Sequence, residues 1–390
     1  MYTIGEEEIQ ALAATIHSGK LFRYQGEEQS QTDLFEQEWA AKIGVQHALA
    51  VTSGTASLIC ALAGLQVGPG DEVILPAYTF IASALAPLAV GAIPILAEID
   101  ESLTLDPADV EAKITPRTKA IMPVHMNGLP ANMDALMDVA RRHDLLVIED
   151  SCQADGGSYK GKRLGSIGDA GGFSFNYFKI ISCGEGGAMV TNDAAVYERA
   201  SLHHDGGCVF FKEGAAKQTP IFAGWNFRFN ELLSAILRVQ LTRLDGLLAG
   251  LREDKRQICE ALAGASGFRF NRVNDPEGEC AVMLSLLFES AQAASAFVDN
   301  LTAAGFSAYS PINSGRHVYA NWEAVMEQRG SVDARRNPFT TGECDWVYTP
   351  DMCPRSLDLM ARTVNLAMSP TREAGERSGL VAAIRQSAGG

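Results

Sequence analysis

The sequence lacks closely paired cysteines. Its eight cysteines are scattered along 390 residues, and no two of them stand in a C-x-x-C arrangement. This pattern excludes the common zinc motifs and the dense disulfide frameworks of small secreted domains, and it indicates reduced thiols. The adjacent His203 and His204 would point in different directions on a helix, so we expect no metal site there.

Clustered positive charge and a long apolar run are also missing. Lys and Arg number 32 against 47 Asp and Glu, and the formal charge of −15 argues against binding nucleic acid. Residues Met1–Gln10 have neither the basic start nor the apolar core of a secretory signal. The most apolar stretch, Ala82–Ala97, contains two prolines and is shorter than the ~20 residues of a membrane span. We expect a cytoplasmic protein with no nucleic-acid or membrane partner.

What the sequence does contain is an alternation of short apolar runs and longer amphipathic segments. Helices are predicted over Gly54–Leu65 and Thr79–Gly91. Strands are predicted at His47–Thr52, Glu72–Leu75, Ile93–Glu98, Ala120–Val124, Leu145–Ile148, Gly171–Asn176 and Ala188–Thr191. Continuous apolar strands between helices favour an α/β fold with a mostly parallel sheet covered on both faces.

A change in pattern suggests two domains. The segment from Asn230 to about Gly264 carries apolar residues at helical spacing, and shorter strands and helices follow it. We expect a large domain over residues 1–249, including an N-terminal segment, and a smaller C-terminal α/β domain over residues 250–390.

Two charged residues follow predicted strands. Asp150 ends a buried type of strand, and ligands of open α/β sheets bind at the carboxyl ends of strands. Lys179 follows the apolar run Phe173–Phe178, where burial would favour the neutral, nucleophilic amine. Taken alone, Asp150 fits a helix cap equally well, and Lys179 fits a lysine that reaches water from a strand end.

A small polar turn, Thr52–Ser57, lies where the first strand gives way to a helix. The N–H groups that open a helix make a good phosphate site, although Ser53 or Thr55 fits a plain N-cap equally well. The turn lacks the G-K-[ST] of a P-loop, and no G-x-G-x-x-G follows a strand. Phe80, at the start of the next predicted helix, is an aromatic that could face a ligand or simply fill the core.

Together these residues suit pyridoxal 5′-phosphate (PLP). This cofactor needs a lysine to attach to, an acid that keeps its pyridine nitrogen protonated and an anion site for its phosphate. Lys179, Asp150 and the Thr52–Ser57 turn supply these three, and Phe80 supplies a ring for the pyridine face.

The chain resembles the DegT/DnrJ/StrS family of PLP-dependent sugar aminotransferases over nearly its whole length. The segments that carry the resemblance, in the family's order and spacing, are Ser53–Ala56, Pro76–Ala82, Thr115–Ala120, Glu149–Gln153, Phe173–Gly187 and Gly224–Glu231. The resemblance implies the PLP-dependent transferase fold of type I and a homodimer with shared active sites.

The resemblance also implies roles for the matching residues. Lys179 would attach the cofactor and move protons, and Asp150 would pair with its ring nitrogen. The implied cofactor contacts are Ser53, Gly54, Thr55, Ala56 through its backbone, Phe80, Asp150, Gln153, Ser174, Lys179 and, toward the neighbouring subunit, Asn226.

Two ends of the chain look like one branch of the family. Leu21–Tyr24 and Asn313–Trp322 resemble the enzymes that make 8-amino-3,8-dideoxy-manno-octulosonate, whereas Asn176–Phe178 and Gly207–Pro220 depart from them. Substrate contacts are predicted for Arg23, Tyr24, Arg316 and His317. A solvated loop explains Arg316 and His317 equally well.

The implied reaction moves an amino group from an amino acid, glutamate or glutamine, to a keto-sugar or related keto-polyol. Both half-reactions use one site, so ping-pong kinetics are expected. Two alternatives stay open. One is a PLP-dependent sugar dehydratase of the same fold, a branch that replaces the lysine or carries iron–sulfur cysteines. The other is a PLP-binding regulator without turnover.

Overall fold

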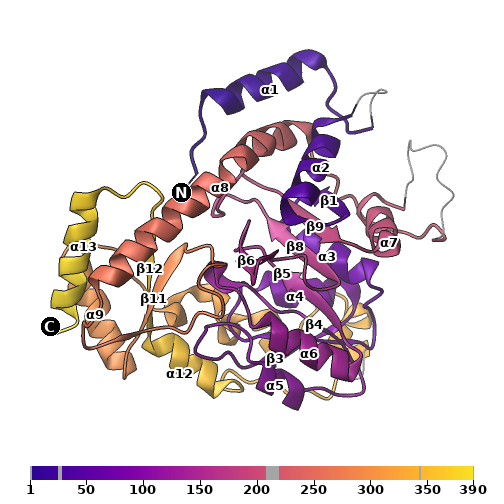
Figure 1. Ribbon diagram of the computed structural model, residues 1–390. Coiled ribbons are helices and arrows are strands. Elements are labelled where there is room, and N and C mark those ends of the chain that lie inside the picture. Colours follow the sequence, from indigo (N-terminus) through magenta and orange to yellow (C-terminus); the bar gives the residue numbers. More distant parts are fainter. Residues whose placement is uncertain (1, 25–28, 208–218, 342–343, 390) are drawn as a thin grey trace.

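The computed structural model describes residues 2–24, 29–207, 219–341 and 344–389, and a seven-stranded sheet lies at its centre (Figure 1). The strand order is β1-β9-β8-β5-β4-β2-β3. The bounds are β1 His47–Val51, β2 Glu72–Pro76, β3 Ile93–Ala97, β4 Thr118–Ile121, β5 Leu146–Asp150, β8 Ala170–Ser174 and β9 Gly187–Thr191. Only β9 pairs antiparallel with its neighbours, so the predicted mostly parallel sheet is confirmed.

The predicted strands are all present, with one displaced. β4 begins at Thr118 and ends at Ile121, two residues before Pro123. Proline has no N–H for a ladder, so regular pairing stops before it. The backbone continues alongside β5 nonetheless, because the carbonyl of Pro123 accepts the N–H of Asp150 at 2.8 Å.

Helices cover both faces of the sheet, as the two neighbouring residues Gly172 and Phe173 of β8 show. Adjacent strand residues point to opposite faces. A Cβ on Gly172 would lie 2.6 Å from Leu58 of α3 (Gly54–Gly64), so α3 packs on one face. On the other face, the ring of Phe173 packs edge-on against Trp39 of α2 (Gln31–Ile43), with centroids 5.0 Å apart.

The remaining helices connect these strands or lie around them. α-Helices in this group are α1 Glu6–Ser18, α4 Ala82–Val90, α5 Pro107–Ala112, α6 Met133–His143 and α7 Ala194–His204. The predicted helix from Thr79 is wrong at its start, since α4 begins at Ala82. The N–H groups of Thr79 and Ile81 instead bond the carbonyls of His317 and Arg316, which holds this stretch in a separate turn.

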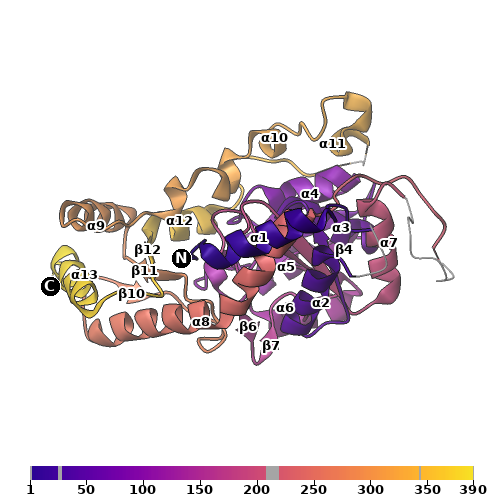
Figure 2. The same ribbon diagram turned by 90° about the horizontal axis from the view of Figure 1, so that it is seen from above.

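A second, three-stranded sheet lies at the far end of the molecule (Figures 1 and 2). Its antiparallel strands are β10 Arg269–Phe270, β11 Met283–Leu287 and β12 Thr363–Ala367. The helices of this part are α9 Ala291–Ala303, α12 Pro354–Arg362 and α13 Ala374–Ser387, whereas α10 Glu323–Met326 and α11 Pro338–Thr341 lie near α4 (Figure 2). The long helix α8, Glu231–Ala261, reaches it from the large sheet, so residue 250 lies inside a helix. The division into residues 1–249 and 250–390 stays a prediction.

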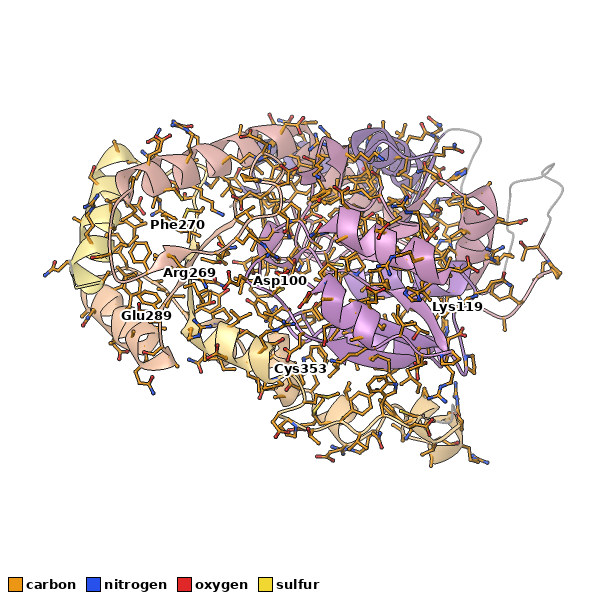
Figure 3. The ribbon with its side chains drawn as sticks, turned by 60° about the horizontal axis from the view of Figure 1, so that its bottom comes forward. Asp100, Lys119, Arg269, Phe270, Glu289 and Cys353 are labelled. Carbon is orange, nitrogen blue, oxygen red and sulfur yellow. The ribbon has the colours of Figure 1, made fainter. Side chains whose placement is uncertain are left out.

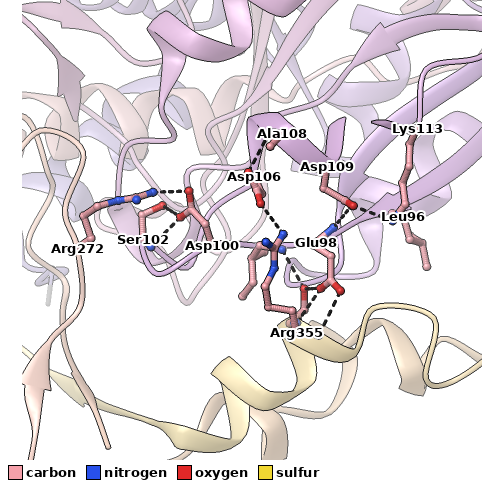
Figure 4. Close-up of polar contacts among 12 residues, drawn as sticks. Leu96, Glu98, Asp100, Ser102, Asp106, Ala108, Asp109, Lys113, Arg272 and Arg355 are labelled. Carbon is pink, nitrogen blue, oxygen red and sulfur yellow. Dashed lines mark hydrogen bonds and ion pairs between the residues drawn. The ribbon is translucent and has the colours of Figure 1, made fainter. Parts of the chain in front are cut away.

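Acidic residues that follow β3 join the two parts of the chain. The carboxylate of Glu98 accepts the N–H groups of Arg355 and Ser356 at the start of α12, at 3.1 and 2.7 Å (Figure 4). Asp100 pairs with Arg272, and Figure 3 shows Asp100 beside Arg269 of β10. These contacts place the start of α12 and the residues after β10 against the carboxyl end of β3.

Seven of the cysteines are free thiols in the described part of the chain, and Cys208 lies outside it. No cluster of His, Cys, Asp and Glu suited to a metal occurs among the described residues. None of the helices within those residues has both the length and the apolar character of a membrane span.

Candidate active site

Four polar residues meet at one edge of the large sheet because each follows, or ends, a strand that runs in the same direction. Ser53 comes two residues after β1, Thr79 comes three after β2, Asp150 ends β5 and Ser174 ends β8. Strand ends of an α/β sheet are where ligands bind. Side chains that lie far apart in the sequence therefore meet at the predicted location of the site.

A cavity at this edge contains most of the predicted cofactor contacts. It is lined by Ser53, Gly54, Thr55, Leu58, Thr79, Phe80, Ala82, Asp150, Cys152, Gln153, Ser174, Asn176, Lys179 and Glu185. Eight of the ten predicted contacts are in this set, and Ala56 and Asn226 are not. Ala56 is buried, and its N–H donates to the Ser53 hydroxyl at 3.1 Å.

Asp150 is held from two sides. Its Oδ1 accepts the backbone N–H of Cys152 at 3.1 Å, and its Oδ2 accepts the hydroxyl of Ser83 at 2.6 Å. The side chain is buried, with 5% of the residue exposed. Both oxygens are thus oriented by short contacts, and the interpretation of Asp150 as a simple helix cap does not describe it, since no helix begins there.

Lys179 lies on a turn that follows β8. The turn is closed where Asn176 bridges Gly184 and where the N–H of Lys179 bonds the carbonyl of Asn176 at 3.1 Å. The amine makes no hydrogen bond or ion pair with any residue that the structure describes. We expected its aromatic neighbours to bury it, and this was wrong: Tyr177 and Phe178 are exposed, and Lys179 is half-buried.

The start of α3 forms the floor of the cavity. The hydroxyl of Ser53 caps the helix by accepting the N–H of Ala56. A Cβ on Gly54 would lie 2.7 Å from Cβ of Ser174 and 2.9 Å from Sγ of Cys152. Glycine is therefore needed for this helix end to approach β8, and the approach brings two hydroxyls beside the helix N-terminus.

Gln153 and Phe80 complete the cavity. The amide oxygen of Gln153 accepts the N–H of Asn127 at 3.1 Å, which leaves its NH₂ end for a ligand. The ring of Phe80 is 44% exposed and lies beside the imidazole of His317, with centroids 5.3 Å apart. Burial lowers the pKa of His317, and the charge of Lys179 lowers it further. His317 therefore lies within electrostatic reach of Lys179.

Comparison with known proteins identifies a family that matches most of this chain. Residues 2–329 match the DegT/DnrJ/EryC1/StrS aminotransferase family. The chain belongs to this family. Its members are PLP-dependent, so the protein is a PLP-dependent aminotransferase with the fold of type I.

Individual relatives agree with the assignment. The aminotransferase is 36% identical over 355 residues to 3-amino-5-hydroxybenzoate synthase of Amycolatopsis mediterranei, covering 88% of this chain and 89% of that one. It is 40% identical over 271 residues to L-glutamine:2-deoxy-scyllo-inosose aminotransferase of Streptoalloteichus tenebrarius, covering 67% and 63%. The crystal structure of a 3-amino-5-hydroxybenzoic acid synthase superposes with a TM-score of 0.82, 31% identity and coverage of 99% and 97%.

The side chains present suit PLP. The cavity offers an amine without a protein partner in the described chain, a fixed carboxylate, and hydroxyls beside a helix N-terminus that only a glycine allows to come close. These groups match the aldehyde, the ring nitrogen and the phosphate of the cofactor, respectively.

Arg23 does not reach this cavity in the described subunit. Its guanidinium is buried and bonds both oxygens of Glu36, at 3.1 and 2.8 Å, and Oδ1 of Asp33. Burial lowers the pKa of Arg23, but Glu36, Tyr24 and Asp33 together outweigh it and raise the pKa above its ordinary value. The guanidinium is thus part of an ion pair within the described subunit, and the predicted substrate contact stays a prediction.

Four other predicted residues are outside the cavity lining as well: Tyr24, Asn226, Arg316 and His317. Burial raises the pKa of the Tyr24 phenol, and Asp205 raises it further. Asn226 is exposed, and its side chain accepts the N–H of Arg228 at 3.3 Å. Arg316 is exposed as well, and its guanidinium has no partner among the described residues.

Sequence reasoning missed the two hydroxyls that support Asp150. Ser83 lies 67 positions before Asp150 and is an ordinary small residue inside an apolar helix. Thr79 was noticed only as part of a family motif. The one signal available was the four-residue spacing of Thr79 and Ser83, which places two side chains on one face of a helical turn.

Proposed function

We propose that this aminotransferase moves an amino group from glutamine or glutamate to a keto-sugar or keto-polyol, with Lys179 as its catalytic residue and Asp150 as the partner of the cofactor ring. The observation that carries the proposal is the meeting of Lys179, Asp150 and the start of α3 in one cavity. The name of the Streptoalloteichus relative supports glutamine as donor and a keto-cyclitol type of acceptor.

The residues of the cavity would hold PLP in these ways. Ser53, Gly54, Thr55 and Ser174 would hold the phosphate, with a contribution from the backbone of Ala56 if its cap to Ser53 opens. Asp150 would accept a hydrogen bond from the ring nitrogen, Gln153 would donate to the ring hydroxyl, and Phe80 would cover the ring. When bound, PLP withdraws electrons from the substrate carbon and so makes its proton removable.

The protein's own part in the chemistry is proton transfer. The amine of Lys179 would take the proton from the donor carbon and return it at a neighbouring position, which requires a neutral amine close to both. Asp150 would keep the ring nitrogen protonated throughout, because both of its oxygens are already fixed by Ser83 and Cys152. One site serving both half-reactions gives ping-pong kinetics.

The assembly we propose is a homodimer with shared active sites. Large hydrophobic side chains are exposed next to Lys179 in the sequence, Tyr177 at 69% and Phe178 at 82%, and Trp225 is exposed at 55%. Exposed patches of this kind are typical of interfaces. Asn226, next to Trp225, would then reach the cofactor phosphate of the other subunit. Free thiols in the described chain support a reducing compartment, the cytoplasm.

The acceptor we propose is an acidic keto-sugar of the octulosonate type. The guanidinium of Arg316, which has no partner in the described part of the chain, can meet a carboxylate. His317, which lies beside Phe80, can bond a sugar hydroxyl in its neutral form, since burial lowers its pKa.

A single-turnover measurement tests the reaction. Protein reconstituted with PLP is mixed with excess glutamine or glutamate and no acceptor, and the keto acid formed is quantified. One equivalent per site is expected, and addition of a keto-sugar should restart turnover. The variant Lys119→Ala, which removes an exposed lysine near the amino end of β4, should behave like wild type. The absence of keto acid with either donor would contradict the proposal.

A further inference from the structure

The carboxylate of Asp150 is linked to a buried chain of hydroxyl groups. Ser83 Oγ lies 2.6 Å from Asp150 Oδ2, and Thr79 Oγ1 lies 2.7 Å from Ser83 Oγ. Thr79 is 1% exposed and Ser83 is 0% exposed, so bulk water does not compete for these contacts. We propose that Ser83, held in turn by Thr79, is a positioning residue for amino transfer because it fixes the carboxylate of Asp150. This role rests on the proposed function of Asp150.

The direction of donation in these hydrogen bonds follows from the chemistry of the groups. An ionised carboxylate only accepts hydrogen bonds, so Ser83 gives its single hydroxyl proton to Asp150. Ser83 must then accept from Thr79, and the order is Thr79 to Ser83 to Asp150. Hydrogen bonds aligned in this way polarise and strengthen one another in a buried site.

The hydroxyl of Ser83 fixes the position of the Asp150 side chain rather than that of its backbone. The backbone is already fixed by the strand ladder, since the N–H of Asp150 bonds Pro123 and its carbonyl accepts the N–H of His125 at 3.0 Å. Within the described part of the chain, the carboxylate is held on one oxygen by the Ser83 hydroxyl and on the other by the N–H of Cys152. Removing the hydroxyl therefore frees one oxygen while the strand stays in place.

The other end of this series of hydroxyls is anchored by the loop that carries Arg316 and His317. The N–H of Thr79 bonds the carbonyl of His317 at 3.1 Å, and the N–H of Ile81 bonds that of Arg316 at 3.0 Å. Phe80 lies between these two anchors and lines the cavity. The segment thus sets the position of the Phe80 ring and, through Ser83, of the Asp150 carboxylate.

Three variants test the role of Ser83. Ser83→Ala should lower kcat of the donor half-reaction about tenfold, the effect of losing one hydrogen bond to a charged group. The donor KM should stay near the wild-type value, because Ser83 does not touch the donor. The visible absorbance band of bound PLP should shift, since the environment of its ring nitrogen changes. Ser83→Thr retains the hydroxyl and should restore both properties.

Thr79→Val removes the first hydroxyl but keeps the side-chain shape. It should reduce kcat by a smaller factor than Ser83→Ala, and it keeps the proposal testable if Ser83→Ala does not fold. Wild-type kcat and an unshifted band in both variants would overturn the role of Ser83 alone. Wild-type protein that converts no donor would overturn the proposed function as well, so the two failures are distinguishable.

Discussion

A Cβ atom placed on Gly54 would lie 2.7 Å from Cβ of Ser174. Real Cβ contacts are essentially never this short, so the first turn of α3 and the end of β8 are as close as a glycine permits. This approach brings Ser53, Thr55 and Ser174 to one cavity. The proposed anion site therefore requires a glycine at position 54.

Gly54→Ala should weaken PLP binding at least about tenfold and lower the free energy of unfolding by about 1–3 kcal/mol, the usual cost of overpacking. Absorbance titration with PLP and urea unfolding measure the two effects. Gly246→Ala is the matched control, because Gly246 is exposed in α8 and a Cβ there meets nothing within 4 Å. It should raise stability by about 0.5–1 kcal/mol and leave binding unchanged. Wild-type affinity in Gly54→Ala would contradict the account.

Glu149→Gln should destabilise the fold by about 3 kcal/mol, because a buried carboxylate loses charge-assisted hydrogen bonds. The carboxylate accepts the N–H groups of Gly165, Ile167 and Gly168. It also accepts from Nε2 of His125, whose Nδ1 is occupied by the N–H of Ala131.

Urea unfolding of the protein without cofactor measures this loss. Glu260→Gln is its control, since Glu260 forms an exposed pair with Arg256 and should change stability by less than about 0.5 kcal/mol. Similar unfolding midpoints for Glu149→Gln and Glu260→Gln would show that the buried network contributes little.

Asp155→Asn should become more stable relative to wild type as pH rises. Asp155 is fully buried and neither carboxyl oxygen has a partner in the described chain. Burial raises its pKa well above the ordinary value, and the charge of Lys179 only partly opposes this. The native state therefore gains stability below the ordinary aspartate pKa of about 3.9, and this gain is lost as pH rises toward the raised pKa.

Asparagine does not titrate. The free energies of unfolding of the two proteins, measured without cofactor from acidic to neutral pH, should therefore diverge, with Asp155→Asn becoming the more stable one. Asp333→Asn should give the opposite trend, because the Arg335 guanidinium lowers the pKa of that exposed carboxyl. A difference between wild type and Asp155→Asn that does not vary with pH would show that Asp155 is not held in its neutral form.

The sequence predicted what depends on local pattern. Apolar runs located the strands of the large sheet, and Asp150, expected at a strand end, lines the cavity there, whereas Ser174 was expected beside it only from the family resemblance. It could not predict what depends on distant partners. The ion pair of Arg23 with Glu36 was not expected, because nothing in the pattern shows that the two residues lie together. α4 begins later than expected because carbonyls more than 200 residues away hold the N–H groups of Thr79 and Ile81.

The central claim is that Lys179 is the residue to which PLP attaches. Protein reconstituted with PLP is reduced with borohydride, which makes the attachment permanent, and its peptides are analysed by mass spectrometry. The account predicts the added mass on the peptide that contains Lys179, and its loss in Lys179→Ala but not in Lys119→Ala. Stoichiometric label on a different lysine, or undiminished label in Lys179→Ala, would contradict it.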